Sequence, residues 1–218
     1  MAPRVIFEQQ LELLKEKFVR MGECVQSGYR KLEEALREND REKLNALLGA
    51  DRQMLDMQRE IENACLGLMT RQQPVARDLR LVSSALKVVT DMERTGDHVS
   101  EVAELFLRRS GEKLISGEGC DEMLLSMMKE AFEMFQEAVE AFVEGREEAA
   151  RGVIARDDVV DDYFNGVKQN MLEAIKNQTC NADEVVDNLM IAKYLEKVGD
   201  HAVQIASWAV FMVTGELD

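Results

Sequence analysis

The sequence predicts an all-α protein made of two pseudo-symmetric, antiparallel three-helix bundles, covering residues 1–112 and 113–218. Strong helix formers, Leu, Glu, Ala, Lys, Arg and Met, are abundant, and only two prolines, Pro3 and Pro74, occur in 218 residues. Apolar residues recur at helical spacing over long stretches. One motif occurs twice, once in each half of the chain. Together these observations predict six long helices, three in each unit.

Segments rich in turn-forming residues separate the expected helices. They are Asn39-Asp40, RQQPV (71–75), the glycine-rich segment 110–122, Glu144-Gly145 and NQTCNADE (177–184). Pro74 suits the first turn of a new helix, and Asn181 with Glu184 resembles a capping box. The short connections predict antiparallel neighbours within each unit.

The third expected helix, residues 79–110, shows one apolar stripe. Its members recur every three or four residues, which is the pattern of one buried helix face. The stripe consists of Val82, Leu86, Val89, Met92, Gly96, Val99, Ala103 and Phe106. We expect these side chains to form part of the core.

The repeated motif reads DMERTGDHV at 91–99 and YLEKVGDHA at 194–202, and it contains the only two histidines of the chain. Glu93, Gly96, Asp97 and His98 align with Glu196, Gly199, Asp200 and His201 at a constant offset of 103 (196 − 93). A glycine inside a helix costs about 1 kcal/mol relative to alanine. Two explanations stay open for it, the close approach of a neighbouring helix and room for a bound ion.

Composition excludes several classes of function. With 42 acidic and 27 basic residues the net charge is −15, and no basic block is present, so nucleic-acid binding is not expected. No apolar run is long enough to cross a membrane and no signal peptide is visible, so we expect a cytoplasmic protein without membrane insertion. The scattered cysteines, Cys24, Cys65, Cys120 and Cys180, form no CxxC pair, and we expect reduced thiols packed as small hydrophobes.

Acidic residues four apart mark the candidate metal site. Glu196 and Asp200 share one helix face, and Asp157 and Asp161 form a second such pair in the preceding helix. If these helices are antiparallel, four carboxylates can converge, and such a cluster favours a hard cation such as magnesium, calcium, manganese or ferric iron. The alternative is that the acids pair with Lys193 or Lys197 on a solvated face, without a metal.

The first unit carries a less complete version of this pattern. Glu93 and Asp97 repeat the second pair, and Asp51 aligns with Asp157, but Leu55 replaces the partner of Asp161. A partly degenerate site or no site is expected there. The histidines lie about 100° around the helix from the aspartates, so we expect them to support the metal ligands from behind, to lie at an interface or to contact a partner, rather than to coordinate a metal. They also lack the Glu-x-x-His spacing of ferritin-like sites.

Three segments resemble the PhoU family of phosphate-transport accessory proteins. They are RQQPVARDLRLV (71–82), DMERTGDHVSEVAE (91–104) and YLEKVGDHAVQIASWAVFMVTGE (194–216). The resemblance covers essentially the whole chain. It implies a cytoplasmic protein of two three-helix bundles that is not an enzyme. Such proteins restrain the phosphate ABC transporter, which we expect here through its ATPase subunit, and help to keep the phosphate-sensing histidine kinase inhibitory.

The resemblance also implies bound metal, because several family members hold multinuclear iron or zinc clusters through E/DxxxD motifs. The positions that match are Glu93, Asp97, Asp157, Asp161, Glu196 and Asp200, with Asp51 as a further candidate. Family members often carry Asn and Glu after the GD aspartate, whereas the second unit has Gln204 and Ser207 there. Its cluster is therefore expected to be smaller. The sequence does not identify the metal, and magnesium and manganese are also candidates. It also does not decide whether the protein forms a homodimer.

A metal-dependent phosphoesterase or ferroxidase is the rival hypothesis from the enzyme class. It is disfavoured because the sequence offers no positioned base, nucleophile or phosphate-binding glycine loop. A helical scaffold without metal is a third reading, in which the ExxxD pairs are only solvated surface.

Overall fold

The computed structural model describes residues 3–49, 51–109, 114–115, 119–179 and 181–216. These residues form helices and connecting turns, and no strand occurs among them. The helices are α1 (Pro3–Glu38), α2 (Arg41–Asn45), α3 (Asp51–Gln72), α4 (Ala76–Arg108), α5 (Cys120–Glu144), α6 (Glu147–Ile154), α7 (Asp157–Asn177) and α8 (Ala182–Thr214). The predicted all-α class is confirmed.

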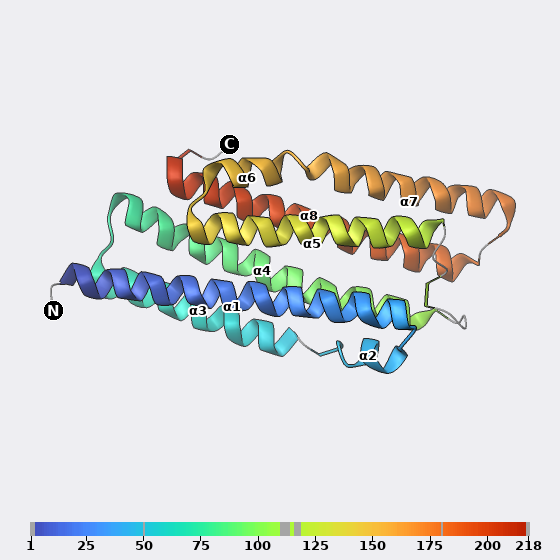
Figure 1. The fold of residues 1–218 in the computed structure, drawn as a ribbon, viewed down its shortest axis with the longest axis horizontal. Coiled ribbons are helices and arrows are strands. Elements are labelled where there is room, and N and C mark those ends of the chain that lie inside the picture. Colours follow the sequence, from blue (N-terminus) through green and yellow to red (C-terminus); the bar gives the residue numbers. More distant parts are fainter. Residues whose placement is uncertain (1–2, 50, 110–113, 116–118, 180, 217–218) are drawn as a thin grey trace.

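The long helices lie side by side along the long axis of the molecule, in two units (Figure 1). The first unit consists of α1 to α4 and the second of α5 to α8. The second long helix of each unit is preceded by a short one, α2 or α6, which the sequence analysis did not separate. The Asp40 carboxylate caps α2 by accepting hydrogen bonds from the backbone N–H groups of Glu42 and Lys43. The chain enters α6 through Gly145, which has a left-handed φ of 66°.

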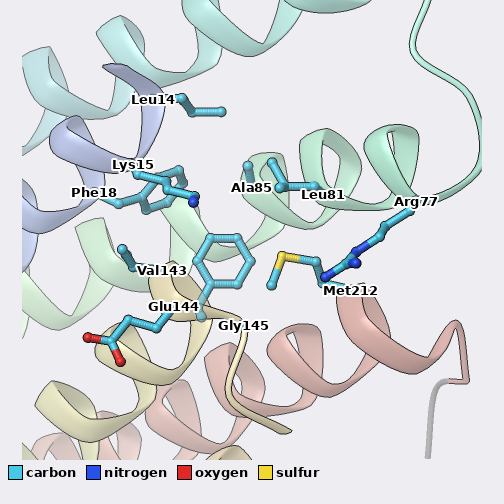
Figure 2. A pocket seen from close by; sticks show the side chains of 11 residues that line it. Leu14, Lys15, Phe18, Arg77, Leu81, Ala85, Val143, Glu144, Gly145 and Met212 are labelled. Carbon is cyan, nitrogen blue, oxygen red and sulfur yellow. The ribbon is translucent and has the colours of Figure 1, made fainter. Parts of the chain in front are cut away.

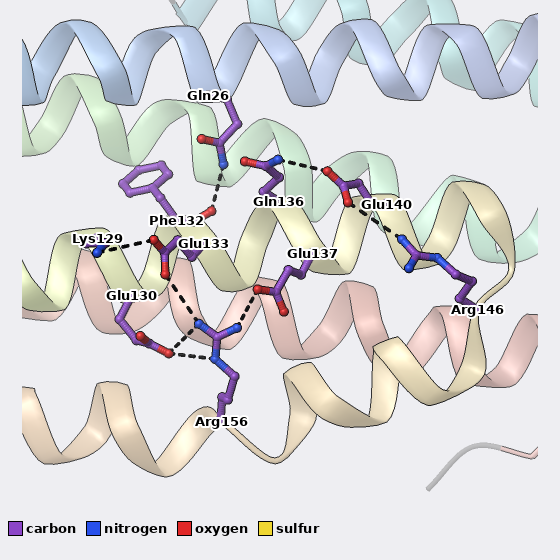
Figure 3. A network of polar contacts seen from close by, with 10 residues as sticks. All are labelled: Gln26, Lys129, Glu130, Phe132, Glu133, Gln136, Glu137, Glu140, Arg146 and Arg156. Atoms are coloured by element: carbon purple, nitrogen blue, oxygen red, sulfur yellow. Dashed lines mark hydrogen bonds and ion pairs between the residues drawn. The ribbon is translucent and has the colours of Figure 1, made fainter.

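The two units are joined by packing of α4 on α8 and of α1 on α5. The ring of Tyr29 on α1 stacks on that of Phe132 on α5, with centroids 4.6 Å apart. Next to this stack, the buried Gln26 donates a hydrogen bond of 2.8 Å to the backbone carbonyl of Phe132 (Figure 3). Apolar side chains of both units are buried against each other at these contacts. The two units therefore share one continuous core.

The apolar stripe predicted on α4 forms part of this core. Seven of its eight members are buried, and Leu86 is half-buried. Three cysteines are free thiols: Cys65 is buried, and Cys24 and Cys120 are half-buried. Cys180 lies outside the described residues.

The predicted helix starts differ in outcome. Asn181 caps α8 as predicted, because its side chain accepts a hydrogen bond of 2.7 Å from the backbone N–H of Glu184. The expectation for Pro74 was wrong by two residues, since α4 begins at Ala76 after an extended Val75. The predicted boundary between residues 112 and 113 lies outside the described residues. No described helix is both long enough and apolar enough for a membrane span.

Candidate functional site

The repeated glycines let the second long helix of each unit approach the third. A Cβ atom on Gly96 would lie 2.8 Å from Cγ of Met54 on α3, and one on Gly199 would lie 3.2 Å from Cγ1 of Val160 on α7. Met54 follows Asp51 by three residues, as Val160 follows Asp157. The two units therefore use the same contact, and the structure supports close helix approach as the reason for the glycine.

The four acids of the second unit lie on two neighbouring helices, α7 and α8. Burial, followed by the negative charges of Asp161 and Asp200, raises the pKa of the Asp157 carboxyl. Burial and the charges of Glu196 and Asp200 likewise raise the pKa of Asp161. The carboxylates of α7 and α8 are therefore near enough for their charges to act on one another.

Arg156, the residue before α7, holds the start of this acidic face against α5 (Figure 3). Its guanidinium donates hydrogen bonds of 2.8 Å to Glu130 and Glu137, and Glu133 lies 3.8 Å away. The acids on α5 hold the guanidinium in place, and Asp157 follows it directly in the chain. This contact fixes the position at which α7 presents its carboxylates.

Two lysines neutralise the acids of α8 in this structure. Lys193 binds Glu196, and Lys197 binds Asp200 and lies 3.8 Å from Glu196. In the described part of the chain, no three His, Cys, Asp or Glu side chains lie together in a group that could hold a metal ion. The carboxylate donors suit a hard cation in chemistry. Binding one in the second unit requires the lysine side chains to turn away.

The first unit presents fewer acids. Glu93 and Asp97 lie on one face of α4, and the guanidinium of Arg94 lies 3.6 Å from Glu93 and 4.0 Å from Asp97. The side chain of Asp51 lies outside the described part of the structure, and Leu55 is exposed. The four-carboxylate arrangement of α7 and α8 is therefore not repeated by the described side chains of this unit.

The two histidines meet at the contact between the units. Their rings stack with centroids 5.6 Å apart and planes inclined by 24°. His201 on α8 binds Asp91 on α4 through Nδ1 at 2.9 Å, and His98 packs on Tyr194 of α8 at 5.3 Å between centroids. An interface role is thus what the structure assigns to both. The hydrogen-bond partners that the structure describes for the two rings are Glu101 for His98 and Asp91 for His201, and neither belongs to an acid pair.

Sequence reasoning did not single out Asp91 and Tyr194. They occupy equivalent places in the repeat, separated by the same offset of 103, and each contacts the histidine of the other unit. Each stands seven residues before the histidine of its own helix, which is two turns along the same face. This seven-residue spacing, repeated in both copies of the motif, is the sequence signal that could have identified the two residues.

A second polar joint links the units near the end of α4. The Arg109 guanidinium donates hydrogen bonds to Asp121 at 2.6 Å, to Asn188 on α8 at 2.5 Å and to the carbonyl of Leu114 at 2.8 Å. Its charged carbon also lies 4.5 Å from the centre of the Phe106 ring. This group was not predicted, because its partners are 12 and 79 residues away in sequence.

The sequence model of the PhoU domain matches the chain twice, over residues 18–106 and 124–209. The chain belongs to the PhoU family. Each match falls within one of the two units, so the repeat of the motif reflects a repeat of the whole PhoU domain.

Two PhoU homologs from other organisms are similar to this chain along nearly their whole length. A phosphate-specific transport system accessory protein PhoU homolog from Clostridium acetobutylicum is 31% identical over 98% of this chain and 96% of its own length. One from Methanothermobacter thermautotrophicus is 30% identical over 98% of this chain and 97% of its own.

Solved structures show the same architecture. The crystal structure of the phosphate transport system regulatory protein PhoU from Streptococcus pneumoniae matches with a TM-score of 0.87 at 26% identity, over 97% of this chain and 99% of that one. PhoU from Pseudomonas aeruginosa gives 0.87 at 27% identity, over 96% and 100%. The pseudo-symmetric PhoU fold is therefore present, and the protein is an accessory protein of phosphate transport.

Proposed function

We propose that this PhoU protein is a cytoplasmic, non-enzymatic regulator that restrains phosphate uptake when phosphate is plentiful. Its partners in this proposal are the ATPase subunit of the phosphate ABC transporter and the phosphate-sensing histidine kinase. The observation that carries the proposal is the match of both units, along nearly the whole chain, to phosphate-transport accessory proteins. The kind of partner follows from that family, and the two named partners follow from the resemblance noted in the sequence.

A bound hard cation in the second unit is part of the proposal. Asp157, Asp161, Glu196 and Asp200 would hold it, and the effect of their charges on one another across α7 and α8 supports this assignment. When bound, the cation would supply a positive centre that relieves this repulsion. Lys193 and Lys197, which now neutralise Glu196 and Asp200, would be released to solvent. For the first unit, Glu93, Asp97 and Asp51 remain candidates.

A pull-down with the two purified partners tests the regulatory role. The full chain is immobilised and exposed to the transporter ATPase subunit or to the cytoplasmic part of the kinase, with chelator or with manganese or iron. The proposal expects retention of at least one partner. Absence of both under every condition would refute it.

Metal analysis tests the second part separately. Protein purified without a histidine tag is expected to carry a hard cation, and the double change Asp161→Ala with Glu196→Ala should remove it. The matched control is Asp162→Ala with Glu173→Ala, two exposed acids on α7 that belong to neither pair. An equal metal content in both variants would contradict the assignment.

The metal-free scaffold is the alternative that a specific observation favours. The pairing of Lys193 with Glu196 and of Lys197 with Asp200 neutralises half of the cluster without an ion. In that case both variants and the parent contain no metal, and partner binding does not respond to chelator. The phosphoesterase and ferroxidase alternatives predict turnover with excess manganese or iron, which assays of phosphate release and iron oxidation can detect.

A further inference from the structure

A cavity of about 100 Å³ opens where α1, α4, α5 and α8 meet, near the ends of α5 and α8 (Figure 2). We call it the helix-end cavity. Its floor is formed by Leu14, Phe18, Phe142 and Met212, and its rim carries Lys15 and Arg77. Met212 follows Glu196 by sixteen residues on α8, which is about 24 Å along a helix. The cavity is therefore separate from the acidic pairs.

The floor is apolar, and its aromatic side chains pack on each other. The rings of Phe18 and Phe142 meet edge to face with centroids 5.2 Å apart, and both side chains are almost fully buried. A volume of about 100 Å³ is several times the roughly 10–15 Å³ that a cavity needs to hold one water molecule. It is smaller than the roughly 300 Å³ at which drug-sized sites begin. The space suits one apolar side chain.

The rim is positively charged although the chain as a whole carries −15. Figure 2 shows Lys15 and Arg77 pointing toward the cavity from opposite sides. Arg77 is exposed, and within the described residues it makes no hydrogen bond or ion pair. Among the side chains that the structure describes, Lys15 pairs with Glu12 alone, on its own helix, at 3.0 Å. An exposed pair of this kind holds its lysine weakly.

Apart from the exposed pair of Lys15 with Glu12, the described neighbouring groups do little to compensate this positive charge. Glu144 on the rim is already bound by Arg146 at 2.5 Å. One turn beyond Arg77, the Arg80 guanidinium packs on Gly215 at the end of α8. Its buried Nε has no hydrogen-bond partner among the described residues. The opening of the cavity thus attracts negative charge while its floor attracts an apolar group.

We propose that the helix-end cavity binds a partner protein through one Phe or Leu side chain flanked by aspartate or glutamate. The apolar side chain fills the floor, and the flanking carboxylates lie against Lys15 and Arg77. A free inorganic anion would leave the apolar floor uncovered, and a basic segment would be repelled at the rim. This site goes beyond the regulatory role proposed above, because it does not depend on the acidic pairs or on a metal.

Fluorescence anisotropy with the full chain tests the proposal. The probe is a labelled peptide of about twelve Gly, Ser and Glu residues with one central Phe, and the matched peptides replace Phe by Ala or every Glu by Lys. We expect saturable binding of the first peptide and at least tenfold weaker binding of the other two. Raising ionic strength from about 50 to about 500 mM should weaken the first complex.

Variants place the interaction at the cavity. Arg77→Ala and Lys15→Ala are each expected to weaken peptide binding at least threefold, since each removes one rim charge. Lys87→Ala removes an exposed charge from α4 outside the cavity and should change nothing. All three changes lie at solvent-accessible side chains, so circular dichroism should show an intact fold.

Two outcomes overturn the proposal. One is equal affinity for the Phe, Ala and Lys peptides, and the other is unchanged binding to the double variant Arg77→Ala with Lys15→Ala. Because the assay contains neither transporter nor kinase, its failure leaves the regulatory proposal standing. A failed pull-down would equally leave this site untouched.

Discussion

His98 and His201, one from each unit, stack on each other at the contact between α4 and α8, with ring centroids 5.6 Å apart. Each also contacts the other unit at a place equivalent in the repeat, Asp91 for His201 and Tyr194 for His98. The motif that marks the repeat in the sequence is thus the segment at which its two copies touch. Its histidines join the units, while the charges of Glu196 and Asp200 act on the acids of the preceding helix, α7.

The first prediction concerns pH. Burial, together with the charge of His201, lowers the pKa of His98, although Glu101 on the same helix opposes this shift. Because the folded pKa lies below the unfolded value of about 6.5, the unfolded chain binds the proton more readily. The contribution of His98 to stability is therefore present above about pH 6.5 and lost as the pH falls through its folded pKa.

Urea unfolding of the parent and of His98→Gln at pH 7.5, 6 and 5 checks this, with pH values chosen around the unfolded pKa of about 6.5. The parent should lose more stability on acidification than the variant does. Lys87→Gln, an exposed change on the same helix, controls for surface effects. Parallel pH profiles for the parent and His98→Gln would contradict the prediction.

The second prediction distinguishes the two motif glycines. Alanine improves helix propensity by about 1 kcal/mol at either place. At Gly96 the added Cβ would overlap Cγ of Met54, near the root of that side chain, and overpacking costs about 1–3 kcal/mol. Gly96→Ala should therefore destabilise by about 1 kcal/mol, whereas Gly199→Ala, with 3.2 Å to Val160, should stay within about 0.5 kcal/mol of the parent.

A double-mutant cycle with Met54→Ala locates the cause of this effect. If the overlap is responsible, the cost of Gly96→Ala should shrink when Met54 is already alanine. Additive costs would assign the destabilisation elsewhere.

The third prediction concerns the buried joint of Arg109 and Asp121. Both side chains are about 12% exposed, so Arg109→Met leaves the Asp121 charge buried without its cation. Removing one partner of a buried pair costs about 3–5 kcal/mol. The double change Arg109→Met with Asp121→Asn should cost less, because no buried charge remains. Arg108→Met, which breaks an exposed pair with Glu104, should cost at most about 0.5 kcal/mol in the same urea titrations.

The fourth prediction concerns the acidic face. The raised pKa of Asp161 means that its ionised form opposes folding, so its favourable contribution exists below the unfolded pKa and is lost as the pH rises through the folded value. Asp161→Asn should accordingly raise stability slightly at pH 7 in chelator, by no more than about 0.5 kcal/mol because the group is largely exposed.

If the proposed cation binds, excess manganese should make the parent more stable than Asp161→Asn. The parent is then expected to gain in melting temperature by ligand linkage, and Asp161→Asn should gain less. Asp162→Asn, an exposed neighbour, should follow the parent in both conditions. Identical metal responses of all three proteins would count against the ligand role of Asp161.

The residues themselves determined the helices, the repeat and the family. Helical spacing placed the stripe of α4 on the core, the Asn181 cap set the start of α8, and the offset between the two motifs established two equivalent units. These features are local, because each depends on residues within a few turns of one helix. The acid pairs could likewise be found from i and i+4 spacing.

Only the tertiary structure decided what these side chains contact. It brings His98 against His201 although 103 residues separate them, and it joins Arg109 to Asn188, 79 residues away. It also places Lys15 on α1 and Arg77 on α4 at the rim of the same cavity. Such contacts depend on how helices distant in sequence pack and rotate against one another, and helical periodicity fixes only which face of each helix turns inward.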